Sequence, residues 1–138
     1  MADHDPDCVF CKIVAGELPA RVIEEDERTI AFLDISPATP GHAVVIPRAH
    51  TADVTTASPE DLAAVAATGQ RVARRALDQL DAIGVNLLNN CGARAWQTVF
   101  HLHLHVIPRY EDDGMRLPWI PTPGDPDAIA AVHARLTG

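Results

Sequence analysis

Aromatic residues, long hydrophobic runs and cysteines are all scarce in this chain. Phe, Trp and Tyr make up 4% of its 138 residues, although hydrophobic residues as a whole reach 47%, a share typical of a folded domain rather than a disordered chain. No apolar run approaches the roughly 20 residues that a membrane span needs, and the start, MADHDPDCVF, lacks the basic-then-apolar order of a signal peptide. We therefore expect a single domain in the cytoplasm that makes no contact with a membrane.

Basic residues are also few: 11 lysines and arginines stand against 19 aspartates and glutamates, for a formal net charge of −8. A chain with this charge repels a nucleic-acid backbone unless a local basic patch intervenes. The densest basic cluster, Arg71, Arg74 and Arg75, has the spacing of a solvated helix face. We expect no nucleic-acid partner, but a small anionic ligand is compatible with the charge, since a few donors can hold one phosphate.

The hydrophobic pattern predicts an α+β fold, with an antiparallel sheet of about five strands, one long helix and a C-terminal helix. Apolar residues between turn signals predict strands in 21–34 (two strands around a turn), 42–47, 85–90 and 98–107. Antiparallel strands with one long helix favour helices on one face of the sheet.

Two segments carry the signals of helices. Ser58-Pro59 suits an N-cap followed by a first helical position, and apolar residues then follow at spacings of three or four as far as about Asp81. Asp125-Pro126 has the same kind of start and opens a final helix. The proline-rich sequence over 115–126 predicts an irregular arm before that helix.

Three of the seven histidines occupy alternate positions in QTVFHLHLHVIPR, residues 97–109: His101, His103 and His105. Side chains alternate between the two faces of a strand, so the three imidazoles are expected on one face. The residues at 102, 104 and 106 are apolar and are expected to face the core. Strands prefer β-branched and aromatic residues, so three solvated histidines are a poor explanation of this pattern.

Two roles remain for these imidazoles: a metal cluster, or a catalytic histidine with supporting neighbours. Near pH 7 imidazole serves as nucleophile, acid, base or metal ligand. One tetrahedral zinc cannot readily bind all three, because His101 and His105 are roughly 13 Å apart on a strand, whereas Zn–N bonds are about 2.0 Å. At most one or two of the histidines are therefore expected to bind a metal.

The same residues resemble the signature of the histidine triad (HIT) family of nucleotide hydrolases and transferases, Q-x-V-x-H-x-H-x-H-x-x-P-R. AFLDISPATPGHAVVIPRAH, residues 31–50, is similar to the nucleotide-binding hairpin of that family, and CVFCKIVAGELPARVIEED resembles the start of zinc-bearing bacterial members close to the Hint branch. The resemblance implies one HIT domain over 1–138, with core motifs in 8–109 and a C-terminal arm and helix in 110–138. It also implies a homodimer.

The resemblance implies a role for each polar residue of the motif. His103 would attack the α-phosphate of a purine nucleotide or nucleotide conjugate, with a backbone carbonyl on a neighbouring strand fixing its tautomer, and the nucleotidyl-histidine would then be hydrolysed. His105 would donate to a phosphate oxygen, and His42 would support the triad from behind. Gln97 would contact the phosphate or the leaving group.

Other residues would bind the nucleotide. By resemblance, the apolar slot around the base would consist of Phe32, Ile35 and Val99. Asp34 would bind the ribose hydroxyls. The phosphate and the leaving group would be contacted by Asn90, Gln97 and Thr98. Without the resemblance, Asp34 reads as a turn residue before Ser36-Pro37. No Mg²⁺ is implied, because the sequence shows no carboxylate cluster suited to an octahedral ion.

Cys8-x-x-Cys11 is a typical half of a tetrahedral zinc site, and three cysteines are a poor framework for disulfides. His50 and His101 are the candidates for the other two ligands, and the resemblance to zinc-bearing relatives implies this Cys-Cys-His-His set. Four protein ligands leave no open position, so the Zn²⁺ would be structural. The alternative is a reduced pair of thiols beside a solvated His50.

The resemblance favours a nucleoside phosphoramidase, which cleaves a P–N bond to release a nucleoside monophosphate. A diadenosine polyphosphate hydrolase is the alternative within the family, and a non-catalytic nucleotide-binding regulatory module is the alternative of another class. The chain departs from the family at Ala95-Trp96, where many relatives have Ala-Gly, and at Cys91. Trp96 would narrow the leaving-group side, stack on a substrate group, or pack the loop.

Overall fold

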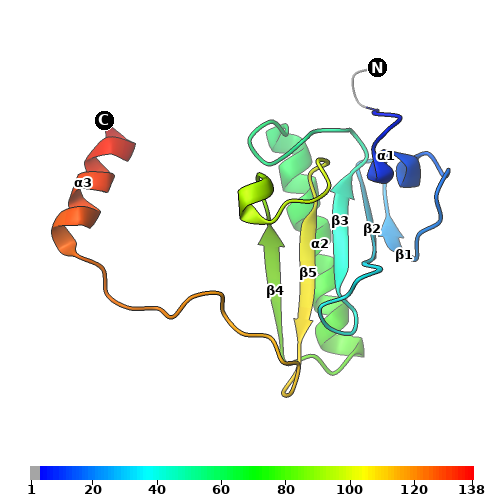
Figure 1. Ribbon diagram of the computed structural model, residues 1–138. Coiled ribbons are helices and arrows are strands. Elements are labelled where there is room, and N and C mark those ends of the chain that lie inside the picture. The colour runs from blue at the N-terminus through cyan, green and yellow to red at the C-terminus, as the bar shows by residue number, and fades with distance from the viewer. Residues whose placement is uncertain (1–3) are drawn as a thin grey trace.

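Five antiparallel strands form one sheet, in the order β1-β2-β3-β5-β4, in this computed structural model, which describes residues 4–138 (Figure 1). The elements in chain order are α1 (Val9–Val14), β1 (Val22–Glu25), β2 (Thr29–Leu33), β3 (Ala43–Pro47), α2 (Pro59–Gln79), β4 (Gly84–Asn89), the 3-10 helix η1 (Ala93–Ala95), β5 (Leu104–Arg109) and α3 (Pro126–Thr137). The expected sheet, long helix and C-terminal helix are confirmed. The first three residues of the expected single domain lie outside the described residues, and the extent of that domain stays a prediction.

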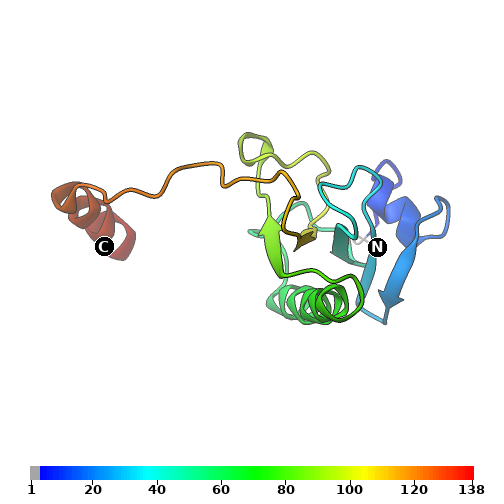
Figure 2. The same cartoon turned by 90° about the horizontal axis from the view of Figure 1, so that it is seen from below.

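The short helix α1 lies on the face of the sheet opposite α2 (Figure 2). The expectation that helices cover one face only was therefore wrong. The side chains of β2 and β3 that point away from α2 pack against α1 through Phe10 and Ile13. This helix has only 6 residues and begins where the Cys8 thiol accepts from the Cys11 N–H. A helix of this length is too short to show an apolar period. The C-x-x-C pattern is therefore visible in the sequence, but the helix that starts at it is not.

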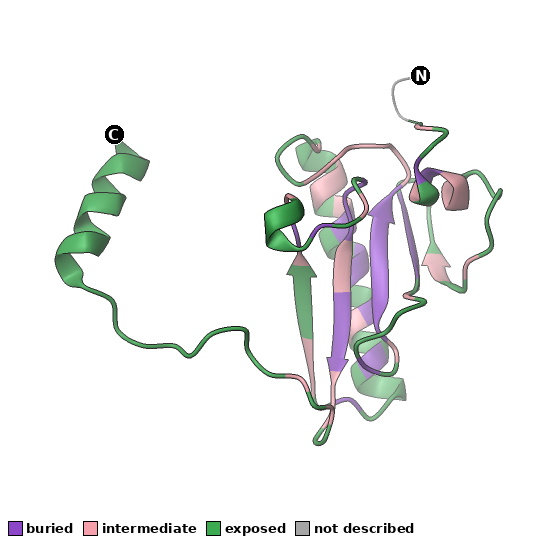
Figure 3. Ribbon diagram, in the orientation of Figure 1, coloured by how far each residue is buried: buried purple, intermediate pink, exposed green. Residues whose placement is uncertain are grey.

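The C-terminal helix α3 lies away from the sheet at the end of an extended arm (Figures 1 and 3). Asp125 caps its start by accepting from the Ala128 N–H at 3.1 Å, as the sequence predicts. All of its residues are exposed, including the apolar Ile129, Val132 and Leu136, so its apolar side adds nothing to the core. Between residues 4 and 138, no helix is both long and apolar enough to cross a membrane.

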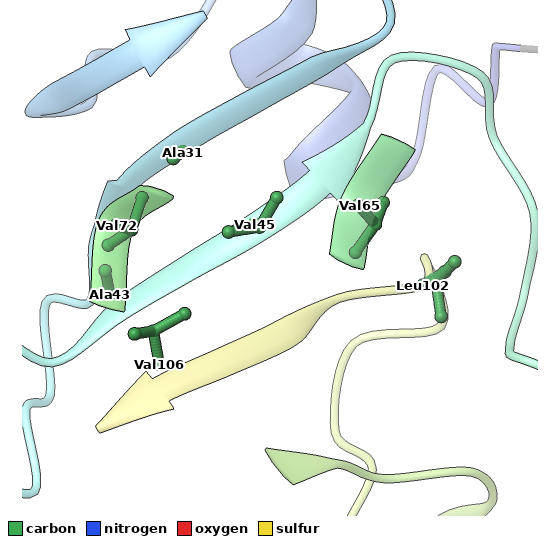
Figure 4. Packing of buried hydrophobic residues seen from close by; sticks show 7 residues of the cluster. All are labelled: Ala31, Ala43, Val45, Val65, Val72, Leu102 and Val106. Carbon is green, nitrogen blue, oxygen red and sulfur yellow. The ribbon is translucent and has the colours of Figure 1, made fainter. Parts of the chain in front are cut away.

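The long helix α2 covers its face of the sheet because its start is capped and one of its sides is apolar. The Ser58 hydroxyl accepts from the Asp61 backbone N–H at 3.1 Å, which satisfies an amide that the first turn leaves free. Val65 and Val72 then pack against the sheet (Figure 4), in a cluster completed by Ala31, Ala43, Val45, Leu102 and Val106.

The strand expected over 98–107 is shorter than predicted, because β5 begins only at Leu104. Before that point the chain has another partner: the Leu102 N–H donates to the Thr51 carbonyl at 2.7 Å. The last pair of the ladder between β3 and β5 is Val45 with Leu104, two residues before Pro47, whose carbonyl accepts from the His101 ring. Proline has no N–H with which to continue a ladder, so two of the three histidines precede the strand.

Candidate active site and metal centre

A row of side chains from four neighbouring strands forms the floor of a cavity on the α1 face of the sheet. The ladders pair Phe32 with Val44, Val44 with His105, and His105 with Leu88. Paired residues point to the same face, and all four line a cavity of about 700 Å³. The strand order therefore places one imidazole, that of His105, in the middle of an apolar floor.

The cavity gathers most of the residues that the sequence predicts for nucleotide binding. Its lining includes Phe32, Asp34, Ile35, His42, Asn90, Thr98, Val99, His103 and His105. Phe10 and Ile13 of α1 also line it and were not predicted, although their i, i+3 spacing is that of one helix face. The Phe10 ring packs edge-on against the rings of His101 and His103, with centroids 5.9 and 5.2 Å away, so these two imidazoles face the same side.

His103 is buried and has one ring nitrogen free. Its Nδ1 lies 2.8 Å from the His101 carbonyl oxygen, and since a carbonyl only accepts, Nδ1 carries the hydrogen and Nε2 keeps its lone pair. The acceptor is two residues earlier on the same segment, not on a neighbouring strand as expected. The Asn89 amide also holds this residue, by donating to the His103 carbonyl at 3.0 Å. An imidazole with a fixed lone pair is suited to nucleophilic attack.

A chain of hydrogen bonds fixes the hydrogens of His42 and His105. The Ala38 N–H donates to His42 Nδ1 at 2.9 Å, so His42 carries its hydrogen on Nε2, which donates to His105 Nδ1 at 2.9 Å. His105 keeps its own hydrogen on Nε2. Burial lowers the pKa of His42, and burial followed by repulsion from His103 and His42 lowers the pKa of His105 to about 4. Both rings are therefore neutral near pH 7, and His105 is a hydrogen-bond donor.

Asp34 takes part in the turn before Ser36-Pro37 and also lies beside two histidines of the cavity, and its contact with the ribose hydroxyls stays a prediction. Its Oδ1 accepts from the Ser36 N–H at 2.8 Å in the turn, and its Oδ2 lies 3.6 Å from His42 Nε2 and 3.9 Å from His105 Nδ1. The three side chains are close enough to share a metal ion, but His42 Nε2 carries a hydrogen as long as Nδ1 accepts from Ala38. This cluster therefore orders hydrogens and does not offer three free lone pairs.

Gln97 belongs to the loop that joins β4 to β5, and the sequence predicts that it contacts the phosphate or the leaving group. The residue is only 3% exposed. Oε1 accepts from the Gly92 N–H at 2.8 Å, and Nε2 donates to the Ala52 and Val99 carbonyls at 2.7 and 3.1 Å. Gln97 is not among the residues of 4–138 that line the cavity. In this structure its amide holds the loop, and the expected contact with the phosphate or the leaving group stays a prediction.

The four predicted zinc ligands converge between α1, the end of β3 and the segment before β5. Cys11 Sγ lies 3.3 Å from His50 Nδ1 and 3.5 Å from His101 Nδ1, and Cys8 Sγ lies 3.5 Å from the same His101 nitrogen. Donor atoms around a tetrahedral zinc with bonds of about 2.0–2.3 Å are roughly 3.3–3.8 Å apart, so the set fits. His101 Nε2 donates to the Pro47 carbonyl at 2.8 Å, which leaves Nδ1 free as a ligand.

Of the three motif histidines, His101 alone joins this cluster within residues 4–138, in agreement with the expectation that at most one or two bind a metal. Burial lowers the pKa of His101 to about 4 and raises the pKa of the Cys11 thiol. A neutral imidazole is ready to bind a metal, whereas a buried thiolate needs a neighbouring cation. Sulfur and nitrogen donors in this number suit Zn²⁺.

The burial of His105 can be tested through pH. Its pKa of about 4 lies below the ordinary 6.5, so below pH 6.5 the unfolded chain takes up a proton that the folded chain does not, and stability is lost as the pH falls toward 4. Between pH 7 and pH 5, the free energy of unfolding should drop by about 2 kcal/mol more in the wild type than in His105→Asn. Urea titrations of both proteins measure this difference, since the Cys-His cluster is common to both. Equal drops would show that His105 titrates normally.

Known proteins are similar to this chain in sequence and in fold. The HIT domain family model matches residues 15–112. Protein hit of Bacillus subtilis is 44% identical over 113 residues, which are 81% of this chain and 78% of that protein. The crystal structure of a Zn-bound histidine triad family protein from Mycobacterium smegmatis superposes with a TM-score of 0.77 at 46% identity, over 95% of this chain and 96% of that one.

A plant relative carries an activity in its name. Adenylylsulfatase HINT3 of Arabidopsis thaliana is 37% identical over 107 residues, which are 78% of this chain but 54% of that protein. The five-stranded antiparallel sheet with its helices is the architecture of the solved relatives. With a family model that spans most of its length and a zinc-bound relative of the same fold, the chain belongs to the histidine triad (HIT) family.

Proposed function

We propose that the protein is a nucleotide hydrolase that cleaves purine nucleoside phosphoramidates through a nucleotidyl intermediate on His103. The observation that carries the proposal is the free Nε2 of His103, which the bond from Nδ1 to the His101 carbonyl fixes in place. This ring lines the cavity beside His105, with 4.9 Å between the two ring centroids. A nucleophile and a hydrogen-bond donor that act on one phosphate need to be this close.

The proposed orientation of the nucleotide follows the lining of the cavity. Phe32 and Ile35, joined by Phe10, would take the purine base together with Val99. Asp34 would accept from the ribose hydroxyls, since a carboxylate can accept from two adjacent O–H groups. The α-phosphate would then lie at the histidines of the motif.

Polar residues from the loop after β4 would contact the phosphate and the leaving group. Asn90 and Thr98 line the cavity and offer an amide and a hydroxyl as donors. Gln97 would act by holding the loop on which these contacts depend, through its bonds to backbone groups.

The reaction would consist of two displacements. His103 Nε2 attacks the α-phosphorus and a P–Nε2 bond forms, while Nδ1–H stays bonded to the His101 carbonyl. The P–N bond to the amine breaks as the amine nitrogen takes up a proton from solvent, and the neutral amine leaves. His105 Nε2–H donates to a phosphate oxygen as negative charge builds there. Water then attacks phosphorus and releases a proton to solvent, the P–Nε2 bond breaks, and the nucleoside monophosphate leaves. Mg²⁺ has no part in this proposal.

A relative's name supports the proposed reacting centre. HINT3 of Arabidopsis thaliana is called an adenylylsulfatase, and the adenylyl group of such a substrate carries its leaving group on the α-phosphate. The proposed attack by His103 is the same whether the leaving atom is nitrogen or oxygen. Activity assays with both kinds of substrate are therefore needed to show which leaving group the protein prefers.

We also propose that Zn²⁺ bound by the Cys-Cys-His-His cluster is structural, because four protein ligands leave no open position. The ion would tie α1 to the segment that carries the nucleophile. His101 faces the cluster with its ring and holds His103 through its carbonyl. Loss of the metal should therefore lower the stability of the fold more than it lowers the activity of the site.

Removal of one ligand tests the zinc. Cys8→Ser is expected to lower the free energy of unfolding by at least about 2 kcal/mol, and to lower kcat/KM by a smaller factor than removal of His103. Elemental analysis should find about one zinc per chain in the wild type and far less in the variant. Cys91→Ser is the matched control, because Cys91 lies outside the cluster. Metal-free protein of unchanged stability would contradict the zinc assignment.

We propose a homodimer, as HIT resemblance implies, on the basis of the uncovered surface at the end of the sheet. Strand β4 is an edge strand with Leu87 and Leu88 exposed, and edge strands left open in this way favour pairing with a second copy. Sedimentation equilibrium should give twice the chain mass of 14.8 kDa. Leu87→Lys should shift the protein toward the monomer, and a wild type that is monomeric at micromolar concentration would contradict the proposal.

The nucleophile can be tested by substitution and by trapping. His103→Asn should abolish turnover of lysine-linked AMP phosphoramidate but keep AMP binding, since asparagine retains a polar group without a ring nitrogen to attack phosphorus. Turnover is measured by AMP release and binding by calorimetry. Mass spectrometry of a quenched wild-type reaction should find the nucleotidyl mass on His103 and on no other residue.

The outcomes separate the competing functions. Full activity in His103→Asn, or an adduct elsewhere, would refute the nucleophile. Faster turnover of diadenosine polyphosphate than of the phosphoramidate would reverse the order of the two substrates. Nucleotide binding with no turnover of either would favour the regulatory module.

A further inference from the structure

We propose that Trp96 forms a stacking subsite for a planar aromatic leaving group, on the side of the α-phosphate away from the nucleoside. The inference rests on the function proposed above and adds the chemical class of the leaving group. It follows from where Trp96 lies, from its backbone conformation and from its exposure.

Trp96 lies at the β4 end of the cavity. The floor runs from Phe32 on β2, across β3, to His105 on β5 and Leu88 on β4. Trp96 follows η1 in the loop after β4 (Figure 1) and lines the same cavity, as does Met115 from the start of the arm. A nucleoside at the Phe32 end, with its phosphate at His105, therefore directs its leaving group toward the Trp96 loop.

The backbone of Trp96 is in the left-handed region, with φ 75° and ψ 16°. Asp81 is the one other non-glycine residue in 4–138 with a positive φ, and this region disfavours residues with a β-carbon, while glycine adopts it freely. The Trp96 N–H closes the turn by donating to the Ala93 carbonyl at 3.1 Å. Glycine would fit this turn without strain, so the indole is held here against a backbone preference.

Packing within the chain does not offset that strain, because Trp96 is 62% exposed. Strained residues of this kind are found where a side chain contacts a ligand. The loop beneath the indole is well held: the Asn90 amide donates to the Trp96 carbonyl at 3.4 Å, and the amide of the next residue, Gln97, bonds three backbone groups. The result is an indole on a fixed backbone with an open face in the cavity wall.

An exposed indole face selects ligands by shape and by charge distribution. Aromatic rings stack on it in offset or edge-to-face arrangements, and a nearby ammonium group gains a cation–π contact. A simple alkyl amine offers neither a ring nor a rigid surface. The leaving group that fits is therefore an amine with a planar aromatic ring a few bonds from the P–N nitrogen.

Two AMP phosphoramidates that differ in the ring test the subsite, one made from tryptamine and one from propylamine. The wild type is expected to prefer the tryptamine conjugate about 3- to 10-fold in kcat/KM, mainly through KM. Trp96→Phe should keep most of this preference. Trp96→Leu, which keeps bulk and backbone strain, and Trp96→Gly, which relieves the strain, should both lower it below about 2-fold.

A merely structural role for Trp96 would change both conjugates by the same factor, so an unchanged ratio in Trp96→Leu and Trp96→Gly would overturn the subsite. If the wild type cleaves neither conjugate, the proposed function fails, and the Kd values of the two intact conjugates, measured by calorimetry, decide the subsite alone. Loss of the binding preference in Trp96→Gly would then support it, and a preference that survives would overturn it.

Discussion

The hydrogen bond from His103 Nδ1 to the His101 carbonyl is the contact on which the rest of the site depends. It joins two tasks within three residues, because the His101 ring faces the Cys-His cluster while its carbonyl decides which nitrogen of His103 is free. Phe10, which stands between the two cysteines on α1, adds an edge contact to both rings. A displacement of α1 would therefore reach His103 both through the polar contacts of His101 and through the apolar contact of Phe10.

Pro47 holds the residue whose carbonyl makes that contact. It has no N–H for the ladder, and its carbonyl instead holds the His101 ring at 2.8 Å. The chain is no longer part of the regular sheet at His101. The His101 ring can therefore face the Cys-His cluster while the His103 ring faces the cavity. On a regular strand, alternate side chains are roughly 6–7 Å apart, whereas the rings of His103 and His105 approach to 4.9 Å between centroids.

Local patterns in the sequence predicted the parts of the fold that depend on local structure. The cap at Ser58, the apolar period of α2 and the short apolar runs of β2 and β3 between turn signals were readable, and the C-x-x-C spacing together with the family resemblance pointed to the zinc ligands. Features that depend on distant partners were not readable. The late start of β5 depends on Pro47 in another strand, and the place of Gln97 depends on the Ala52 carbonyl, 45 residues away. Helix α1 was too short to show a period.

The loop between β4 and β5 is fastened by the Gln97 side chain and not by strand pairing. Residues 93–96 lie between the end of β4 and Gln97. Substitutions among them can change one wall of the cavity and leave the sheet and His103 in place. If the proposed function holds, such substitutions would change which leaving group the protein accepts and leave the proposed reaction at His103 unchanged. Selectivity would then evolve through this one loop, separately from the residues of the sheet.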